Sequence, residues 1–306
     1  MENNPNTLPV LVVGATGFLG MEICSQLIKR NKIVRGLIRS TSDPAKVHLL
    51  ENMGVETVVG DIKDVSSLNN ACNGAGAVIS TVSSTLSRQE GDSIESVDNK
   101  GQKNVIDAAA AANIKRFIYI SFNQMPYECP LEVAKRRVEK HLAESGVPFT
   151  VLQPTFFMDV WLSPHLGFDH PNAKASIYGE GENKITWIAI KDVAAFAVNA
   201  LDNEALINRT IELGGPQPLS PLEVIAIFEE QEGTKFQVTH VPEEVLMMQK
   251  NSANDPLSES FAALMLSYAK GNAIDMKDVL SICNISMTSV KDYAKSVIVP
   301  VKAGAV

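Results

Sequence analysis

Short apolar runs alternate with longer amphipathic stretches along the first half of the chain. Continuous apolar runs are typical of strands buried on both faces of a parallel sheet, whereas apolar residues that recur every three or four positions are typical of helices. The pattern predicts strands at 10–13, 32–40, 55–61, 76–81, 116–121 and 149–154, and helices at 21–30, 44–53, about 93–112 and 130 to about 146. This regular alternation predicts an α/β fold with a doubly wound parallel sheet.

The pattern is less regular after residue 155, where loop-forming sequences such as SPHLGFDHPNAK and YGEGEN occur. Further elements are predicted there: a strand and then a helix that begins near Asp192 and is capped by it, a strand at 209–215, a helix that opens with Ser220, Pro221 and Glu223, a strand at 236–242, and short helices to about Ser296. We expect residues 1–155 to form a Rossmann core. Residues 156–306 would form a mixed region, in which about 185–215 complete the sheet and the rest forms a smaller α+β C-terminal lobe for substrate binding or as a lid.

The stretch from Pro9 to Gly20, PVLVVGATGFLG, combines a strand, a glycine turn and the start of a helix. Gly14 permits the tight turn, Gly17 lets the backbone approach a pyrophosphate, and Gly20 lets the helix pack closely on the strand. The phosphates would lie on the unpaired N–H groups at the positive end of the helix. Because the strand before and the helix after supply the context that the motif requires, the stretch predicts dinucleotide binding.

The end of the second strand distinguishes NADP from NAD. A site for NAD usually has Asp or Glu there to hold the ribose 2′-hydroxyl, whereas an arginine accepts the additional phosphate of NADP. This chain has Arg39 followed by Ser40, and no acidic residue before Asp43. NADP is therefore favoured; the alternative is that Arg39 is only an exposed charge at a strand end. Arg35 is a weaker candidate because it lies in the middle of the strand.

Polar residues also end the third and fourth strands. Asp61 should lie beside the adenine, because ligands collect at the carboxyl ends of parallel strands, but it could also cap the next helix. The fourth strand ends in Ser80, Thr81 and Val82. These residues suit backbone contacts to the nicotinamide half, and they equally suit an ordinary loop.

Lys135 lies on the helix predicted from Pro130 to about Gly146. Leu131, Ala134, Val138 and Leu142 form its apolar stripe, and Lys135 lies at the edge of that stripe. The ammonium could reach a cofactor ribose or a substrate oxygen, or it could extend to water over a packed stem. After the sixth strand come Phe156, Phe157, Met158 and Trp161, which could wall a pocket for an apolar substrate or belong to the core.

Composition excludes several function classes. The formal net charge is −8 and no run of basic residues occurs, which argues against direct nucleic-acid binding. The four cysteines form no CxxC pair, and His165 and His170 have poor metal-ligand spacing and are expected at the surface, so no metal or disulfide is predicted. The N-terminal MENNPNTLP does not resemble a signal peptide and no apolar stretch is long enough for a membrane span. We expect a soluble, cytoplasmic protein, and the sequence does not indicate its oligomeric state.

The chain resembles the NmrA-like group of atypical short-chain dehydrogenases/reductases, which is close to isoflavone-reductase-like and quinone-reductase proteins. The resemblance rests on GATGFLG, on IRS at 38–40, on GD at 60–61, on KRRVEKHLAESGVPFTVLQPTFFM at 135–158, and on IAIKDVAAFAVNAL and IELGGPQPLSPLEV. It covers about two thirds of the chain and fades after Pro242.

The resemblance implies NADP(H) as the cofactor. The implied contacts are Gly14, Thr16, Gly17, Phe18, Leu19, Gly20, Arg39, Ser40, Asp61, Ile62, Ser80, Thr81, Val82, Ser121 and Lys135, and the implied substrate pocket holds Phe122, Phe156, Phe157, Met158 and Trp161. Lys135 corresponds to the lysine of the YxxxK pair, whose tyrosine is replaced by Leu131, a residue with no proton to donate. Ser121 comes one residue before the usual catalytic serine, and Phe122 takes that place. Tyr127 could replace the missing acid only if the intervening loop folds back.

Two functions are consistent with this sequence. The first is an NADPH-dependent reductase of a small carbonyl, quinone or conjugated compound, in which Lys135 or water supplies the proton. The second is a non-catalytic NADP(H)-binding redox sensor that acts through a protein partner. The aromatic residues after the sixth strand favour the reductase, and the missing tyrosine and serine favour the sensor. We favour the reductase, because hydride transfer is the cofactor's own chemistry and mainly requires positioning.

Overall fold

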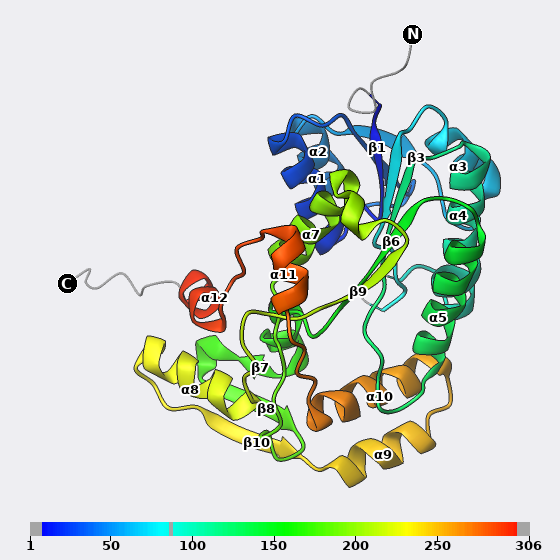
Figure 1. The fold of residues 1–306 in the computed structure, drawn as a ribbon. Helices are drawn as coiled ribbons and strands as arrows, with labels where there is room; N and C mark the ends of the chain where they lie inside the picture. Colours follow the sequence, from blue (N-terminus) through cyan, green and yellow to red (C-terminus); the bar gives the residue numbers. More distant parts are fainter. Residues whose placement is uncertain (1–7, 86–87, 299–306) are drawn as a thin grey trace.

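A parallel sheet forms the centre of the protein. The computed structural model describes residues 8–85 and 88–298, so the polar segment 1–7 lies outside the described residues. Within them, a seven-stranded sheet has the order β3-β2-β1-β4-β5-β6-β9, and every neighbouring pair is parallel (Figure 1). Its strands are β1 (Val10–Val13), β2 (Val34–Ile38), β3 (Glu56–Val59), β4 (Ala77–Ser80), β5 (Arg116–Ile120), β6 (Phe149–Pro154) and β9 (Arg209–Leu213). The predicted doubly wound parallel sheet is confirmed, and its strand order changes direction between β1 and β4, where such folds bind ligands.

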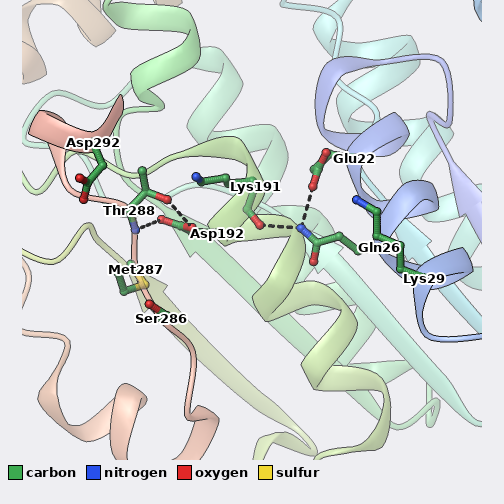
Figure 2. A pocket seen from close by; sticks show the side chains of 9 residues that line it. All are labelled: Glu22, Gln26, Lys29, Lys191, Asp192, Ser286, Met287, Thr288 and Asp292. Carbon is green, nitrogen blue, oxygen red and sulfur yellow. Dashed lines mark hydrogen bonds between the residues drawn. The ribbon is translucent and has the colours of Figure 1, made fainter. Parts of the chain in front are cut away.

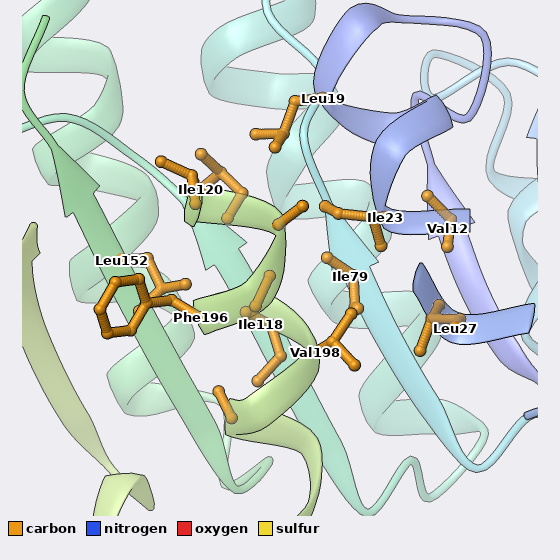
Figure 3. Packing of buried hydrophobic residues seen from close by; sticks show 14 of the residues in the cluster. Val12, Leu19, Ile23, Leu27, Ile79, Ile118, Ile120, Leu152, Phe196 and Val198 are labelled. Carbon is orange, nitrogen blue, oxygen red and sulfur yellow. The ribbon is translucent and has the colours of Figure 1, made fainter. Parts of the chain in front are cut away.

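Helices cover both faces of this sheet. One face carries α1 (Phe18–Lys29), α2 (Pro44–Asn52), α7 (Ile190–Asp202) and α11 (Lys277–Cys283), and the other carries α3 (Val65–Cys72), the π-helical segment η2 (Ile94–Gly101), α4 (Gln102–Ala111) and α5 (Pro130–Glu144). On the first face, Ile23 and Leu27 of α1 lie near Val12 and Ile79 of the sheet, and Phe196 of α7 lies beside Leu152 of β6 (Figure 3). Burying each such side chain contributes about 1.5–3 kcal/mol, so both faces hold the strand ends in place.

The second part of the chain builds a smaller sheet with its own core. Strands β7 (Phe168–Asp169), β8 (Lys174–Tyr178) and β10 (Gln237–Val241) are ordered β10-β8-β7, with β10 parallel and β7 antiparallel to β8. Its helical elements are α6 (Met158–Trp161), η3 (Pro164–Leu166), η4 (His170–Asn172), α8 (Pro221–Glu232), α9 (Glu243–Asn251), α10 (Pro256–Lys270) and α12 (Val290–Val297), while η5 (Glu204–Leu206) precedes β9. Trp187, Phe228 and Leu266 are buried in this second core. Figure 1 shows α10 close to α5 of the larger part.

Several local predictions need correction. Helix α1 begins at Phe18, three residues before the predicted start, because Gly17 is its N-cap. The helix predicted at about 93–112 is divided into η2 and α4. The strand predicted before α7 is wrong, since Ile185 and Ile188 form only isolated bridges. His170 is not a free surface residue, because its ring lies 3.2 Å from a carboxylate oxygen of Glu232 and its side chain is only 15% exposed.

The predicted cap by Asp192 is also wrong. Helix α7 begins at Ile190, whose N–H donates to Asp159 Oδ2 at 2.8 Å. The carboxylate of Asp192 instead accepts from the N–H and the hydroxyl of Thr288, at 2.7 and 2.9 Å, and burial raises the pKa of this carboxyl. This contact lies in a pocket of about 520 Å³ that is lined by Glu22, Gln26, Lys29, Lys191, Asp192, Ser286, Met287, Thr288 and Asp292. Figure 2 shows these side chains. Through these hydrogen bonds, Asp192 connects α7 to the segment between α11 and α12.

Candidate cofactor site and buried lysine

The glycine turn after β1 has two glycines that the fold itself requires. Gly14 has a φ of +92°, and a Cβ there would lie 2.6 Å from Thr81 Oγ1. A Cβ on Gly20 would lie 2.1 Å from the carbonyl oxygen of Gly14. Both distances are too short for a side chain, so these two glycines shape the turn and let α1 pack against it.

Gly17 differs from the other two glycines. It is exposed, its φ of −77° and ψ of 164° suit any residue, and a Cβ there would meet only the Gly14 oxygen, at 3.3 Å. The fold therefore does not require a glycine here. As N-cap of α1, Gly17 provides no side-chain cap, and the first turn holds no acidic residue. The first N–H groups of a helix lack intrahelical acceptors, so this position offers an open cradle for an anion such as a pyrophosphate.

The other residues of the turn occupy different surroundings. Thr16 is half-buried and Leu19 is buried in the core. Phe18 is 71% exposed, and the Lys46 ammonium lies 5.6 Å from the centre of its ring. Phe18 and Gly17 are therefore the parts of the turn that a ligand can reach most directly.

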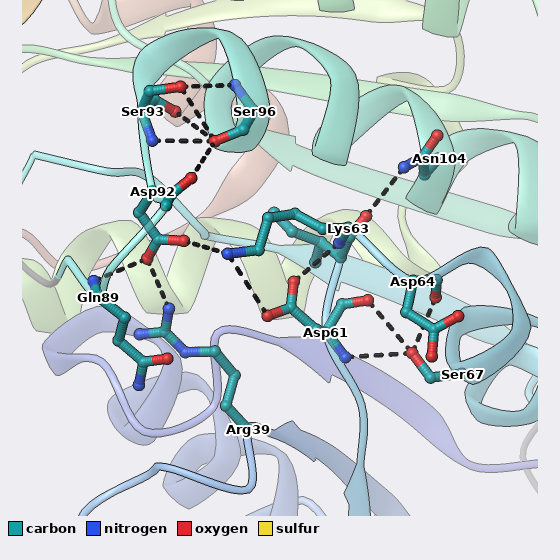
Figure 4. Close-up of polar contacts among 12 residues, drawn as sticks. Arg39, Asp61, Lys63, Asp64, Ser67, Gln89, Asp92, Ser93, Ser96 and Asn104 are labelled. Atoms are coloured by element: carbon teal, nitrogen blue, oxygen red, sulfur yellow. Dashed lines mark hydrogen bonds and ion pairs between the residues drawn. The ribbon is translucent and has the colours of Figure 1, made fainter.

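Arg39 and Lys63 meet at the ends of β2 and β3. The Arg39 Nη1 donates to Asp92 Oδ2 at 2.7 Å, and the Lys63 Nζ donates to Asp92 Oδ1 at 2.5 Å (Figure 4). The Gln89 N–H donates to the same carboxylate at 2.9 Å. Burial alone would raise the pKa of Asp92, but the contacts with Lys63, Gln89 and Arg39 outweigh it and lower that pKa. Arg39 is thus fixed at the strand end where the sequence places it.

Asp61 lies beside this cluster and does not cap α3. Its Oδ1 accepts from the Lys63 N–H at 2.8 Å, and its Oδ2 lies 3.8 Å from Lys63 Nζ. The N-cap of α3 is Asp64, so the interpretation of Asp61 as a helix cap is wrong. Ile62 is buried against Gly101, and Ser40 is exposed.

The end of β4 lies against the glycine turn. Thr81 Oγ1 donates to the Val13 carbonyl at 3.2 Å, and the Ser80 hydroxyl donates to Gln102 at 2.7 Å. The Gln102 amide in turn donates to the Val82 carbonyl at 2.7 Å. Because the side chains of Ser80 and Thr81 form hydrogen bonds within the protein, this segment would contact a ligand mainly through its backbone.

Lys135 is buried beside an acidic partner. Its side chain is 6% exposed, its Nζ lies 3.8 Å from Asp98 Oδ1 and 5.5 Å from the centre of the Tyr119 ring. Asp98, on η2, accepts from the N–H and hydroxyl of Ser84 at 3.0 and 2.6 Å through Oδ2. Burial lowers the pKa of Lys135, and the charge of Asp98 opposes that shift. The ammonium thus does not extend to water.

Two residues that contact Lys135 carry buried polar atoms with no hydrogen-bond partner among the described residues: Asp98 Oδ1 and the Tyr119 hydroxyl. Unsatisfied buried polar groups are costly, by about 1–3 kcal/mol each, and are uncommon in folded proteins. These atoms beside Lys135 are available for hydrogen bonds to a ligand or to water. Among the described residues, four other side-chain atoms are also buried without a hydrogen-bond partner: Arg35 Nε, Asn99 Oδ1, Arg116 Nη1 and Asn123 Nδ2.

The positions that would hold a tyrosine and a serine are otherwise occupied. Leu131 is buried, and its N–H donates to the Ser260 hydroxyl of α10 at 3.1 Å. The Ser121 hydroxyl donates to Glu139 at 2.5 Å, and the Arg136 guanidinium lies 5.7 Å from the centre of the Phe122 ring. Tyr127 is half-buried and packs between the second core and the cluster around Leu131.

The residues expected in a substrate pocket lie in three different clusters. Phe156, Met158 and Trp161 belong to the second core, where Trp161 stacks on Tyr268 with ring centres 5.4 Å apart. Phe157 packs against the first face of the large sheet, and Phe122 belongs to the small cluster around Leu131. Among them only Phe122, Phe157 and Trp161 are half-buried rather than buried.

Lys63, Asp92 and Asp98 did not emerge from the sequence as site residues. Lys63 lies two residues after Asp61 of the GD pair, which was a usable signal, since it places a cation at the same strand end as Asp61. Asp92 and Asp98 pair with Arg39 and Lys135 across 53 and 37 positions of the sequence, and no local pattern indicates such pairs. Neither a group of His, Cys, Asp and Glu suited to a metal nor a helix able to span a membrane occurs in residues 8–85 and 88–298.

The NmrA-like family model matches residues 6–294 of the chain. The chain belongs to the NmrA-like family. Curated relatives include the photosystem II assembly factor Ycf39 of Synechocystis sp., 31% identical over 79% of this chain and 73% of the relative, and the isoflavone reductase homolog IRL of Zea mays, 29% identical over 86% of each. Among solved structures, the NADPH-dependent quinone oxidoreductase QOR2 of Escherichia coli, complexed with NADPH, aligns with a TM-score of 0.75 at 21% identity over 94% of this chain and 99% of that one.

Proposed function

We propose that this NmrA-like protein binds NADP(H) and reduces a small carbonyl, quinone or conjugated organic compound. The observation that carries the proposal is the open Gly17 at the uncapped N-terminus of α1. The fold does not need a glycine there, so the absence of a side chain is best explained by a ligand whose pyrophosphate approaches the backbone. Relatives named as reductases, and a structural neighbour described as complexed with NADPH, support the same assignment.

We assign Arg39 to the 2′-phosphate of the cofactor. It lies at the end of β2, the position that distinguishes NADP from NAD in this type of fold, and Asp92 holds its guanidinium at 2.7 Å. Asp61 and Ile62 would lie on the adenine side, and Ser80, Thr81, Val82 and Ser121 on the nicotinamide side. A guanidinium supplies charge-assisted hydrogen bonds to a phosphate, which an NAD ribose lacks.

We assign Lys135 the role of holding the proton that the substrate receives. Bound NADPH supplies a hydride to the substrate. The buried ammonium releases a proton from Nζ more readily than an exposed lysine, because burial lowers its pKa. Asp98, 3.8 Å away, keeps the cation in place. Phe122 and Trp161, which are half-buried, are the aromatic side chains that a substrate can contact most readily. Residues 1–155 would hold the cofactor, and the later residues would cover the substrate.

A second candidate function is an NADP(H)-binding regulator that acts through a protein partner. Two observations favour it: Leu131 occupies the tyrosine position and is buried, and the Ser121 hydroxyl is used by Glu139. Relatives described as photosystem II assembly factors show that names in this family are not confined to reductases. In this alternative, cofactor binding would select one arrangement of the protein without turnover.

Steady-state NADPH oxidation by the purified protein distinguishes these two functions. The assay uses a panel of quinones, aldehydes and conjugated ketones, together with direct titration of NADPH. The proposal expects turnover with at least one acceptor, and expects that Lys135→Met removes turnover but retains NADPH binding. Lys140→Met is the control on the same helix, because Lys140 is 76% exposed. Tight NADPH binding with no turnover on any acceptor would favour the regulator, and no NADPH binding would refute both.

A further inference from the structure

The cluster at the ends of β2 and β3 contains a second cation, Lys63, to which the proposed function assigns no role. Arg39 and Lys63 come from two different strand ends and meet at one carboxylate, that of Asp92 (Figure 4). The Asp92 side chain is 1% exposed, whereas those of Arg39 and Lys63 are 28% and 32% exposed. The carboxylate therefore lies behind the two cations, and both cations keep part of their surface open to solvent.

We infer that Lys63 is a second cation for the 2′-phosphate of NADP(H), and that Asp92 is the positioning residue that holds Lys63 and Arg39 ready for it. This inference rests on the proposed function, which assigns only Arg39 to the phosphate. A phosphate has three terminal oxygens and can accept from a guanidinium and an ammonium together. Since both cations already converge on one point, a phosphate that meets their open surfaces can bind both.

The geometry favours positioning by Asp92 over competition with the phosphate. An exposed carboxylate between two cations would occupy the place of the ligand, but this one is buried beneath them. Its backbone is also held: Ser93, the next residue, forms a reciprocal capping box with Ser96, and the Ser96 hydroxyl donates to the Gly91 carbonyl at 3.0 Å. These contacts hold the backbone on both sides of Asp92, just before η2 begins.

Preorganisation is the physical benefit of this arrangement. Arginine and lysine side chains have many rotamers and lose much of this freedom when they are ordered. Asp92 orders both before the ligand arrives, so less of that freedom remains to be lost on binding. The charges of Arg39 and Lys63 are also balanced by Asp92 and by Asp61, whose Oδ2 is 3.8 Å from Lys63 Nζ. The cluster is therefore stable without a ligand.

Calorimetric titration of the full-length protein with NADP⁺, NAD⁺ and adenosine 2′,5′-bisphosphate tests the inference. Loss of a charge-assisted hydrogen bond in Lys63→Met should weaken NADP⁺ and the bisphosphate on the order of tenfold and leave NAD⁺ within about twofold. Lys63→Arg, which keeps the cation, should restore most of the affinity. Lys277→Met is the matched control, because Lys277 is 88% exposed and also pairs with an aspartate.

The positioning role of Asp92 is tested by the ratio of NAD⁺ to NADP⁺ dissociation constants. Asp92→Asn places an amide donor toward one cation, so the preference for NADP⁺ should fall on the order of tenfold. Asp92→Glu displaces the carboxylate and should also lower it; this second variant keeps the test valid if the first does not fold, as judged by thermal unfolding.

Three results of these titrations would contradict three different claims. Equal losses for NADP⁺ and NAD⁺ in the Lys63 or Asp92 variants would overturn the inference, since a purely structural role predicts them. A higher NADP⁺ preference in Asp92→Asn would overturn the positioning role, because the carboxylate would then compete with the phosphate. Failure of the unaltered protein to bind NADP⁺ would refute the proposed function itself, and it is measured first.

Discussion

Replacing Gly17 by alanine tests whether the glycine at this position is required for cofactor binding or for the stability of the fold. The added Cβ would lie 3.3 Å from the Gly14 carbonyl oxygen and would otherwise point into open space, and the backbone already has an extended conformation. The turn must therefore yield by only a few tenths of an ångström. An alanine is also a poorer N-cap than glycine, and together these effects should lower the free energy of unfolding by about 1 kcal/mol or less.

Cofactor binding should respond much more strongly to the same change. A methyl group at Gly17 lies on the surface that a pyrophosphate must approach to reach the first N–H groups of α1. Losing even one or two of those charge-assisted hydrogen bonds, at about 1.5–3 kcal/mol each, raises the NADPH dissociation constant at least tenfold. Gly17→Val should abolish measurable binding.

Gly20→Ala is the matched control, because it adds the same methyl group three residues later. There the Cβ would lie 2.1 Å from the Gly14 oxygen, so α1 must move away from the turn. Overpacking of this kind costs about 1–3 kcal/mol or more, and thermal unfolding without ligand should show it. NADPH fluorescence titration then gives the affinities. Unchanged NADPH affinity in Gly17→Ala, in a protein that melts normally, would refute the assignment of the pyrophosphate to this turn.

Three further predictions follow from the charged groups. Arg39→Ala should weaken NADPH on the order of tenfold and NADH by much less; equal losses in parallel titrations would mean that Arg39 does not contact the 2′-phosphate. If Lys135 supplies the proton, turnover should decline as the pH rises through the pKa of its ammonium, which burial places below the ordinary lysine value, and a pH–rate profile that is flat up to pH about 10 would contradict this. Because the pKa of Asp92 is lowered in the folded protein, its ionisation stabilises the fold above the unfolded-state pKa of about 4 and ceases to do so as the pH falls through the folded value. The stability difference between the unaltered protein and Asp92→Asn, from urea unfolding at several pH values, should therefore be largest near neutrality and shrink in acid.

Local signals in the sequence predicted elements well. Strand β6 has the predicted bounds, Phe149–Pro154, and α8 begins with the predicted capping box of Ser220 and Glu223, with Pro221 in the first turn. In both places the residues that determine the structure are neighbours in the chain. The glycine turn was predictable for the same reason, because each glycine acts within seven residues of the others.

Predictions failed where a side chain finds its partner far away in the sequence. Asp192 has the position of a helix cap, yet it binds Thr288, 96 residues later, and Asp159 takes its expected role. Asp92 and Asp98 were missed because their cationic partners are set by the strand order and by the packing of η2 on α5. A carboxylate gains a similar free energy from a hydrogen bond to a nearby donor and to one far away in the sequence. Which donor it binds is therefore determined only by the assembled fold.

The hydrogen bond from the Leu131 N–H to Ser260 affects how the protein can be assembled. The first turn of the helix that carries Lys135 completes its hydrogen bonding through α10, a segment 129 residues later. During synthesis, the ribosome must therefore release most of the chain before this helix start is satisfied and its apolar neighbours Leu131 and Ala134 are covered by Ala263. A fragment that ends after β6 would contain every strand around the glycine turn except β9, but the lysine helix would begin with an unpaired N–H and an exposed apolar side. The half of the chain that holds the glycine turn therefore depends on α10 to complete the start of the lysine helix.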